Sequence, residues 1–209
     1  MPSSRLLRFR TAVADDAEAL ARIDAESWPA PLAATADQWR SRIASFPGGQ
    51  WVAVFDGEPA AVATAQRISE AFLRAGPVTY ERLTDGGTFR RSHAADGDIY
   101  QLVAVGAGAV VRGFGLGRRL IDKQIEIARA MPGIRRIIGL TRPARYHRHP
   151  SLSIDEYVNL RHKTGRRFDP VLEFHLGYGA SLVSTHAEFR PDDAESLGYG
   201  VLIEYPVAT

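Results

Sequence analysis

The chain has no cysteine among its 209 residues. This absence excludes disulfide bonds, a zinc–thiolate site and a cysteine nucleophile. No apolar run approaches the roughly 20 residues that a membrane-spanning helix needs. The N-terminus also lacks the apolar stretch of a secretory signal. Together these absences predict a cytoplasmic protein with no membrane partner.

Lysine is nearly absent, because Lys123 and Lys163 are the only two and arginine supplies the rest of the 26 basic residues. The formal net charge is only +2. The arginine pairs are scattered along the chain and form no continuous stripe, which argues against a nucleic-acid partner. Arginines that line the site of a phosphorylated cofactor explain some of these residues equally well.

Length and composition predict one globular domain over residues 1–209, because 45% hydrophobic and 24% charged residues are typical of such domains. Two segments look like insertions into it. Residues 70–97 are rich in turn signals and form an irregular stretch with one helical turn at about 80–83. Residues 143–165 form a loop followed by a short helix. We expect both insertions to supply side chains to the active-site pocket.

Strand and helix patterns follow one another along the chain. Short apolar runs predict strands at 6–10, 51–55, 60–66, 98–105, 134–141, 182–186 and 201–205. Helical spacing predicts helices that start near residues 15, 36, 115, 153 and 170. The Asp56-Gly57 dipeptide marks a hairpin. Asp169 followed by Pro170 predicts a helix N-cap with proline at the first helical position.

A glycine-rich turn joins the strand at 98–105 to the helix at 115–130. Gly113, Gly115 and Gly117 leave the backbone N–H groups unobstructed by a Cβ atom. Because these groups lie at the start of a helix, they favour an anion, and Arg112 adds a positive side chain. A pyrophosphate fits this turn. The alternative is a tight turn that only allows helix and strand to pack. The fingerprints of P-loop and dinucleotide-binding proteins are both absent.

The segment Arg112-Gly113-Phe114-Gly115-Leu116-Gly117 matches the R/Q-x-x-G-x-G/A signature of the GNAT superfamily of N-acetyltransferases. The order of elements is also similar over nearly the whole chain. The resemblance implies an α/β fold with a mixed, mostly antiparallel sheet of six or seven strands flanked by helices. It implies that the sheet opens after its fourth strand and that the cofactor is acetyl-CoA or another acyl-CoA.

The same resemblance assigns the cofactor-binding groups. The pantetheine arm pairs with exposed backbone of the fourth strand at Leu102, Val103, Ala104 and Val105. The pyrophosphate takes the amides of Gly113, Phe114, Gly115, Leu116 and Gly117, with Arg112 nearby. The sequence departs from the family at residues 106–111, where the linker to the arginine is longer and lacks the usual proline. We therefore expect the strand exit to have a different shape.

Residues 169–180 resemble the D-P-x-L-x-F-H-x-x-x-G-A segment of a narrower branch. This branch comprises GNAT-like domains found beside nitrilase-type hydrolases or in polyketide synthase loading modules. In the loading-module branch, a threonine at the end of the fifth strand and this helix histidine are tied to decarboxylation of malonyl-CoA. Thr141 and His175 occupy the two positions.

Two chemistries are open at this site. For acyl transfer, His175 is the candidate base with Asp98 and Glu173 behind it, and Tyr178 is the candidate acid. Backbone N–H groups of the fourth strand would hold the thioester oxygen. For decarboxylation, the Thr141 hydroxyl and a His175 N–H would hydrogen-bond to the carboxylate or the enolate in a dry pocket. The purely structural alternatives are that His175 is a packed core histidine and that Tyr178 anchors the end of a helix.

The leading prediction is an acyl-CoA-dependent acyltransferase that moves an acyl group to a small acceptor, such as an amine, or to a carrier-protein thiol. The alternatives are a malonyl-CoA-type decarboxylase and a CoA-binding module without turnover. Tyr146, Tyr157 and Arg145 are expected to cover the acyl pocket. His147 and His149 lack a third ligand at metal-site spacing, so no metal is predicted. The resemblance allows a homodimer, although no residue pattern demands one.

Overall fold

The computed structural model describes residues 6–207, and its seven strands form one sheet in the order β1-β2-β3-β4-β5-β7-β6. The pair β4–β5 is parallel and the other five pairs are antiparallel. The predicted mixed, mostly antiparallel sheet is therefore confirmed. The strands are β1 (Leu7–Thr11), β2 (Gln50–Phe55), β3 (Glu58–Ile68), β4 (Ile99–Ala107), β5 (Arg136–Thr141), β6 (Ser181–His186) and β7 (Gly200–Tyr205).

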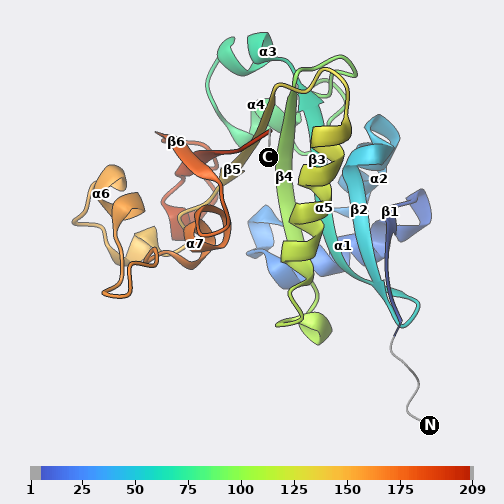
Figure 1. Ribbon diagram of the computed structural model, residues 1–209, viewed down its shortest axis with the longest axis horizontal. Coiled ribbons are helices and arrows are strands. Elements are labelled where there is room, and N and C mark those ends of the chain that lie inside the picture. The colour runs from blue at the N-terminus through green and yellow to red at the C-terminus, as the bar shows by residue number, and fades with distance from the viewer. Residues whose placement is uncertain (1–5, 208–209) are drawn as a thin grey trace.

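Helices flank both faces of this sheet (Figure 1). They are α1 (Ala17–Ser27), α2 (Ala36–Ser45), α3 (Glu70–Arg74), α4 (Tyr80–Thr84), α5 (Leu116–Ala130), α6 (Ile154–Asn159) and α7 (Pro170–Leu176). Short 3-10 turns lie at η1 (Ala14–Asp16), η2 (Ala30–Leu32), η3 (Pro47–Gly49), η4 (Ala109–Val111), η5 (Tyr146–Arg148) and η6 (Ala194–Ser196). Within residues 6–207, none of the helices has the length and apolarity to cross a membrane.

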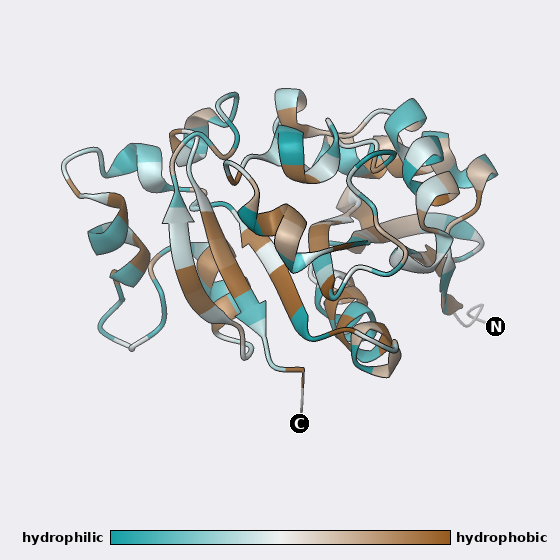
Figure 2. Cartoon of the chain, turned by 90° about the horizontal axis from the view of Figure 1, so that it is seen from above, coloured by the Kyte–Doolittle hydropathy of each residue, from teal (hydrophilic) through white to brown (hydrophobic). Residues whose placement is uncertain are grey.

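The alternation of side chains along the strands assigns the helices to the two faces. Val52 and Val62 lie opposite each other and pack against the buried residues of α1 and α2. Ala53 and Ala61 point to the other face and pack against α5. Figure 2 shows the result, with long hydrophobic stretches on the strands and mixed hydropathy on the helices. Small residues on β2 and β3 let α5 approach the sheet closely, so its N-terminus is fixed beside β4.

The sheet opens between β4 and β5. Their parallel pairing covers only residues 99–102 of β4 and ends where Leu102 meets Gly139. Beyond that point β5 pairs with β7 alone, while β4 continues to Ala107 beside β3. Val103 is an extra residue at a bulge, because Ala104 pairs with Thr64 and Leu102 pairs with Ala65. The edge of β4 after Leu102 is thus unpaired on the β5 side.

The chain leaves β4 close to the end of α1. Gly106 passes so close to α1 that a Cβ atom there would lie 2.9 Å from Ser27 Oγ. The Ser27 hydroxyl in turn accepts a hydrogen bond of 3.0 Å from the Ala107 amide. The strand therefore runs on to Ala107 against the end of α1, and the 3-10 turn η4 then leads to Arg112.

The segment 70–97 is less irregular than predicted. It forms α3 and α4, which bury Leu73 and Leu83 against Ile99 and Ile138 of the central strands. Ser69 and Thr79 cap the two helices through their side-chain oxygens. This segment covers one face of the sheet as a layer of the core.

Candidate active site

A cavity of about 270 Å³ lies where β4 and β5 part. Its walls come from the end of α1, residues 102–105 of β4, residues 139–142 after the parting point, helix α7, and single residues of α5 and β7. All four predicted pantetheine-binding residues, Leu102, Val103, Ala104 and Val105, lie on this wall. The cavity follows directly from the register, because the unpaired edge of β4 leaves room that side chains do not fill.

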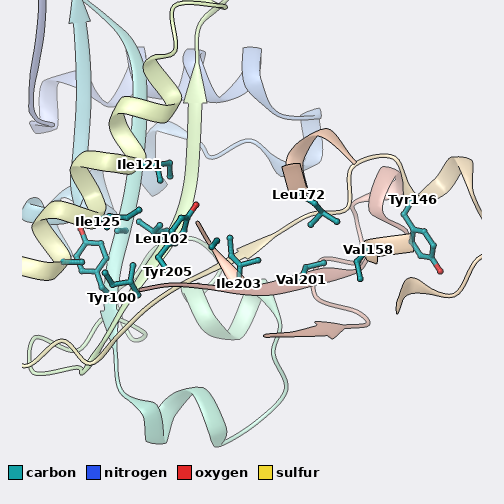
Figure 3. Close-up of a cluster of buried hydrophobic side chains, with 14 of the residues drawn as sticks. Tyr100, Leu102, Ile121, Ile125, Tyr146, Val158, Leu172, Val201, Ile203 and Tyr205 are labelled. Carbon is teal, nitrogen blue, oxygen red and sulfur yellow. The ribbon is translucent and has the colours of Figure 1, made fainter. Parts of the chain in front are cut away.

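The cavity receives no side chain from residues 70–97 or 143–165. The prediction that both segments line the pocket is therefore wrong for this cavity, and Tyr80 is the one described residue of the two segments that borders a smaller neighbouring cavity. Tyr146 and Tyr157 instead pack on each other, with ring centroids 5.1 Å apart, and are 6% and 1% exposed. They belong to a buried cluster beneath α7 together with Leu172 and Val201, part of which is drawn in Figure 3. Arg145 also lies outside the cavity wall.

The glycine-rich turn presents free amides at the start of α5. Gly113 and Gly115 have φ of +86° and +69°, a region that favours glycine. Gly115 is the N-cap of α5 and supplies no side-chain cap. Within residues 6–207, the amides of Gly113, Gly115, Leu116 and Gly117 have no hydrogen-bond acceptor. These donors, on a helix of 15 residues, match the needs of a pyrophosphate.

The other two predicted residues of the turn, Phe114 and Arg112, already have hydrogen-bond partners. The Phe114 side chain is 52% exposed, and its amide already donates to the Val111 carbonyl. The Arg112 guanidinium donates to the Glu26 carbonyl at the end of α1. Arg112 thus ties the turn to α1, and the free amides are the stronger candidates for the anion.

We expect Gly115→Glu to weaken coenzyme A binding at least about 100-fold, because its carboxylate would stand where the pyrophosphate binds. The control is Gly165→Glu, since Gly165 has a similar φ of +82° and likewise no atom within 4 Å of an added Cβ. Calorimetric titration with coenzyme A measures the difference. Equal affinities of the two variants would remove the turn from the binding site.

Thr141 and His175 both line the cavity. Thr141 ends β5 and is 6% exposed, and its hydroxyl has no hydrogen-bond partner among residues 6–207. A buried polar group without a partner costs about 1–3 kcal/mol, so its retention suggests that a ligand satisfies it. His175 lies on α7, and its Nδ1 is 2.8 Å from the Tyr205 hydroxyl oxygen.

The imidazole of His175 is held neutral. Burial lowers its pKa to about 4, and the positive charge of Arg118 acts in the same direction. The predicted carboxylates behind it are absent from its surroundings. Asp98 accepts from the Glu70 amide at 2.8 Å, and Glu173 accepts from the Arg167 amide at 2.8 Å. That prediction is wrong, and the partner of His175 is the phenol of Tyr205, which sequence spacing gave no reason to choose.

Asp169 positions the helix that carries His175. As predicted, it caps α7, accepting from the amides of Val171 at 2.9 Å and Leu172 at 3.1 Å. Its other oxygen accepts from the Tyr157 hydroxyl at 2.8 Å and the Arg145 amide at 2.9 Å. The segment 143–165 therefore acts on the site indirectly, by anchoring the start of α7.

Tyr178 does not share the cavity wall with Thr141 and His175. It follows the end of α7, is 57% exposed and does not line the cavity. The Arg118 guanidinium lies 4.1 Å from the centre of its ring. This placement is typical of a surface contact. The predicted acid is therefore not on the cavity wall that carries Thr141 and His175.

Sequence reasoning missed Trp28 and Arg190. Trp28 lines the cavity, and its Nε1 is buried without a partner among the described residues. It also borders a smaller cavity of about 20 Å³, shared with Arg190 and Tyr80. The Arg190 guanidinium lies 4.0 Å from the centre of the Tyr80 ring and donates to the Leu32 carbonyl. Burial lowers the pKa of Arg190, so an anion nearby would stabilise its charge.

The two cavities therefore offer donors and positive charge rather than carboxylates. Asp193 is the one carboxylate among the described lining residues, and Arg142 already forms an ion pair with it. Arg142 also bonds to Glu195 at 2.8 Å. This charge balance suits an anionic acyl group better than a cationic amine.

The model of the acetyltransferase (GNAT) family matches residues 15–150, and the chain belongs to this family. It is 29% identical to the uncharacterized N-acetyltransferase YkwB of Bacillus subtilis (strain 168) over 205 residues, which are 95% of this chain and 88% of that protein. The family resemblance is thus confirmed.

Two solved structures have similar folds. The GphF GNAT-like decarboxylase in complex with isobutyryl-CoA is 30% identical, with a TM-score of 0.82 over 96% of this chain and 99% of that one. The loading GNATL domain of CurA from Lyngbya majuscula is 23% identical, with a TM-score of 0.85 over 97% of this chain and 98% of that one, and it supports the fold alone. The expected acyl-CoA cofactor agrees with the isobutyryl-CoA held by GphF.

Proposed function

We propose that this protein decarboxylates a malonyl-type acyl-CoA and releases the shortened acyl-CoA. One observation carries the proposal. The buried, unpartnered hydroxyl of Thr141 shares an apolar cavity with the neutral imidazole of His175. Decarboxylation needs hydrogen-bond donors for an enolate and no acceptor substrate, and these two groups supply such donors.

The binding groups suit such a substrate. The pyrophosphate would bind the free amides at the start of α5, and the pantetheine arm would pair with the open edge of β4 after Leu102. The thioester would then reach the cavity between β4 and β5. The substrate carboxylate would lie toward the smaller cavity, within reach of the Trp28 indole N–H and the Arg190 guanidinium.

The reaction breaks the bond between the carboxylate carbon and the α-carbon. Its electron pair moves into the thioester as an enolate, and carbon dioxide leaves. The Thr141 hydroxyl and the Nε2–H of His175 would donate to the negative charge that develops on the thioester oxygen. The α-carbon then takes a proton from water, because loss of the Nε2 proton from a neutral imidazole would leave a buried imidazolate. A cavity walled mainly by apolar groups favours loss of the charged carboxylate.

Acyl transfer is the second candidate, favoured by the resemblance to YkwB, which is named an N-acetyltransferase. The same cavity is less suited to it. An amine acceptor must lose a proton, and a histidine with a pKa of about 4 is a weak base for an ammonium group. The sequence alone favours transfer, whereas the charges and donors of the cavity favour decarboxylation.

Malonyl-CoA labelled with carbon-13 in its free carboxylate tests the proposal. We expect the protein to release labelled carbon dioxide without any acceptor. Thr141→Val should lower the rate about 100-fold, which is typical for removal of one donor to a developing oxyanion. Thr141→Ser keeps the hydroxyl and should retain most of the rate. A wild-type protein that releases no label, or a valine variant as fast as wild type, would contradict the proposal.

A further inference from the structure

The contact between His175 and Tyr205 joins helix α7 to the end of strand β7. His175 comes from α7, and Tyr205 is the last residue of β7. The Tyr205 oxygen and His175 Nδ1 are 2.8 Å apart, and the two rings meet at 70°. The mechanism above uses the other ring nitrogen, Nε2, and leaves Tyr205 without a role.

The surroundings of Tyr205 constrain its proton. The residue is 2% exposed and lies in the same apolar cluster as Leu102 and Ile125, as Figure 3 shows. Burial raises the pKa of the phenol to about 12, so it keeps its proton at neutral pH. Among residues 6–207, His175 Nδ1 is the one hydrogen-bond partner of this hydroxyl.

A buried hydroxyl whose proton has no acceptor destabilises the folded protein, so the phenol proton of Tyr205 needs an acceptor. His175 Nδ1 can accept only when it carries no proton itself. The neutral imidazole then holds its single proton on Nε2. The opposite tautomer would leave the phenol proton without a partner among the described residues.

We propose that Tyr205 is a positioning residue whose hydroxyl donates to Nδ1 of His175 and so fixes the imidazole in the tautomer with its proton on Nε2. This inference rests on the proposed function for its effect on turnover. The fixed tautomer keeps Nε2 a hydrogen-bond donor toward the enolate oxygen while the α-carbon takes its proton from water.

Tyr205→Phe tests the inference, because it removes the hydroxyl and keeps the ring. With nitrogen-15 in the histidine rings, His175 of the wild type should show an unprotonated Nδ1 and a protonated Nε2 between pH 6 and 8. The resonances are assigned by their loss in His175→Ala. In Tyr205→Phe the two nitrogens should shift toward a mixture of tautomers. The kcat for malonyl-CoA should fall about tenfold with KM unchanged, which corresponds to one lost hydrogen bond.

The matched control is Tyr178→Phe, which removes an exposed hydroxyl outside the cavity and should change neither the spectrum nor kcat. The spectrum is recorded without substrate, so it decides the inference even if malonyl-CoA is not turned over. A tautomer change in Tyr205→Phe with no wild-type turnover would support the positioning role and reject the proposed reaction. An unchanged His175 spectrum in Tyr205→Phe would overturn the positioning role.

Discussion

Replacement of His175 by alanine is expected to lower turnover of malonyl-CoA at least about 100-fold while coenzyme A binding stays unchanged. The side chain lies on the cavity wall, which includes none of the free amides that start α5. Its loss removes an N–H donor to the developing negative charge, but no group that would hold the pyrophosphate. Steady-state turnover and calorimetric binding separate the two effects.

His186→Ala is the matched control. His186 is also partly buried, and burial lowers its pKa too, but it lies on β6 and does not line the cavity. We expect it to keep wild-type turnover. Equal turnover in His175→Ala and His186→Ala would remove His175 from the catalytic group.

The pH dependence of the rate tests the protonation state of His175. Because burial lowers the pKa of His175 to about 4, its imidazole is neutral throughout the physiological range. The rate should therefore show no His175-dependent step between pH 5.5 and 8. Any His175-dependent change should appear only as the pH approaches the lowered pKa, where Nδ1 takes up a proton and can no longer accept from the Tyr205 hydroxyl. A step near the ordinary histidine pKa that vanishes in His175→Ala would contradict a neutral imidazole.

Asp169→Ala is expected to cost roughly 3–5 kcal/mol of folding stability. Asp169 is 1% exposed and accepts four hydrogen bonds, from two amides of α7, the Tyr157 hydroxyl and the Arg145 amide. Alanine removes the cap and also leaves the Tyr157 hydroxyl and the Arg145 amide without this acceptor. Urea denaturation measures the loss.

Thr35→Ala is the control for capping alone. Thr35 caps α2 by accepting one hydrogen bond of 3.2 Å from the Gln38 amide, at an exposed position. Its loss should cost about 1 kcal/mol. Because α7 also carries His175, Asp169→Ala should lower turnover even where the protein remains folded. If Asp169→Ala proves as stable as Thr35→Ala, the buried network does not hold α7 in place.

The parts of the fold that sequence predicted are those set by local patterns. The apolar stripe at Leu116, Leu120 and Ile121 and the preceding glycines placed α5 and its turn correctly, because helical spacing and positive φ are local properties. The N-cap at Asp169 was predicted for the same reason. The membership of Thr141 and His175 in one site came from the family resemblance, and both line one cavity.

The parts that sequence missed depend on contacts across the sheet. Trp28 directly follows α1, Arg190 lies in the segment before β7 and Tyr205 ends β7, and no spacing along the chain connects them. The assignment of carboxylates to His175 was wrong for the same reason. Glu173 is near His175 in the sequence, but the helix turns its side chain toward Arg166 and Arg167. Residues 70–97 looked irregular because α3 and α4 are too short to show helical periodicity.

Mass spectrometry of the coenzyme A thioesters, after incubation with malonyl-CoA or acetyl-CoA and no acceptor, tests the proposed reaction most directly. We expect malonyl-CoA to become acetyl-CoA while added acetyl-CoA persists unchanged. Thr141→Val and His175→Ala should leave most of the malonyl-CoA intact under the same conditions. Malonyl-CoA that persists with the wild-type protein, together with acetyl-CoA that is consumed once an amine is added, would contradict decarboxylation and establish acyl transfer.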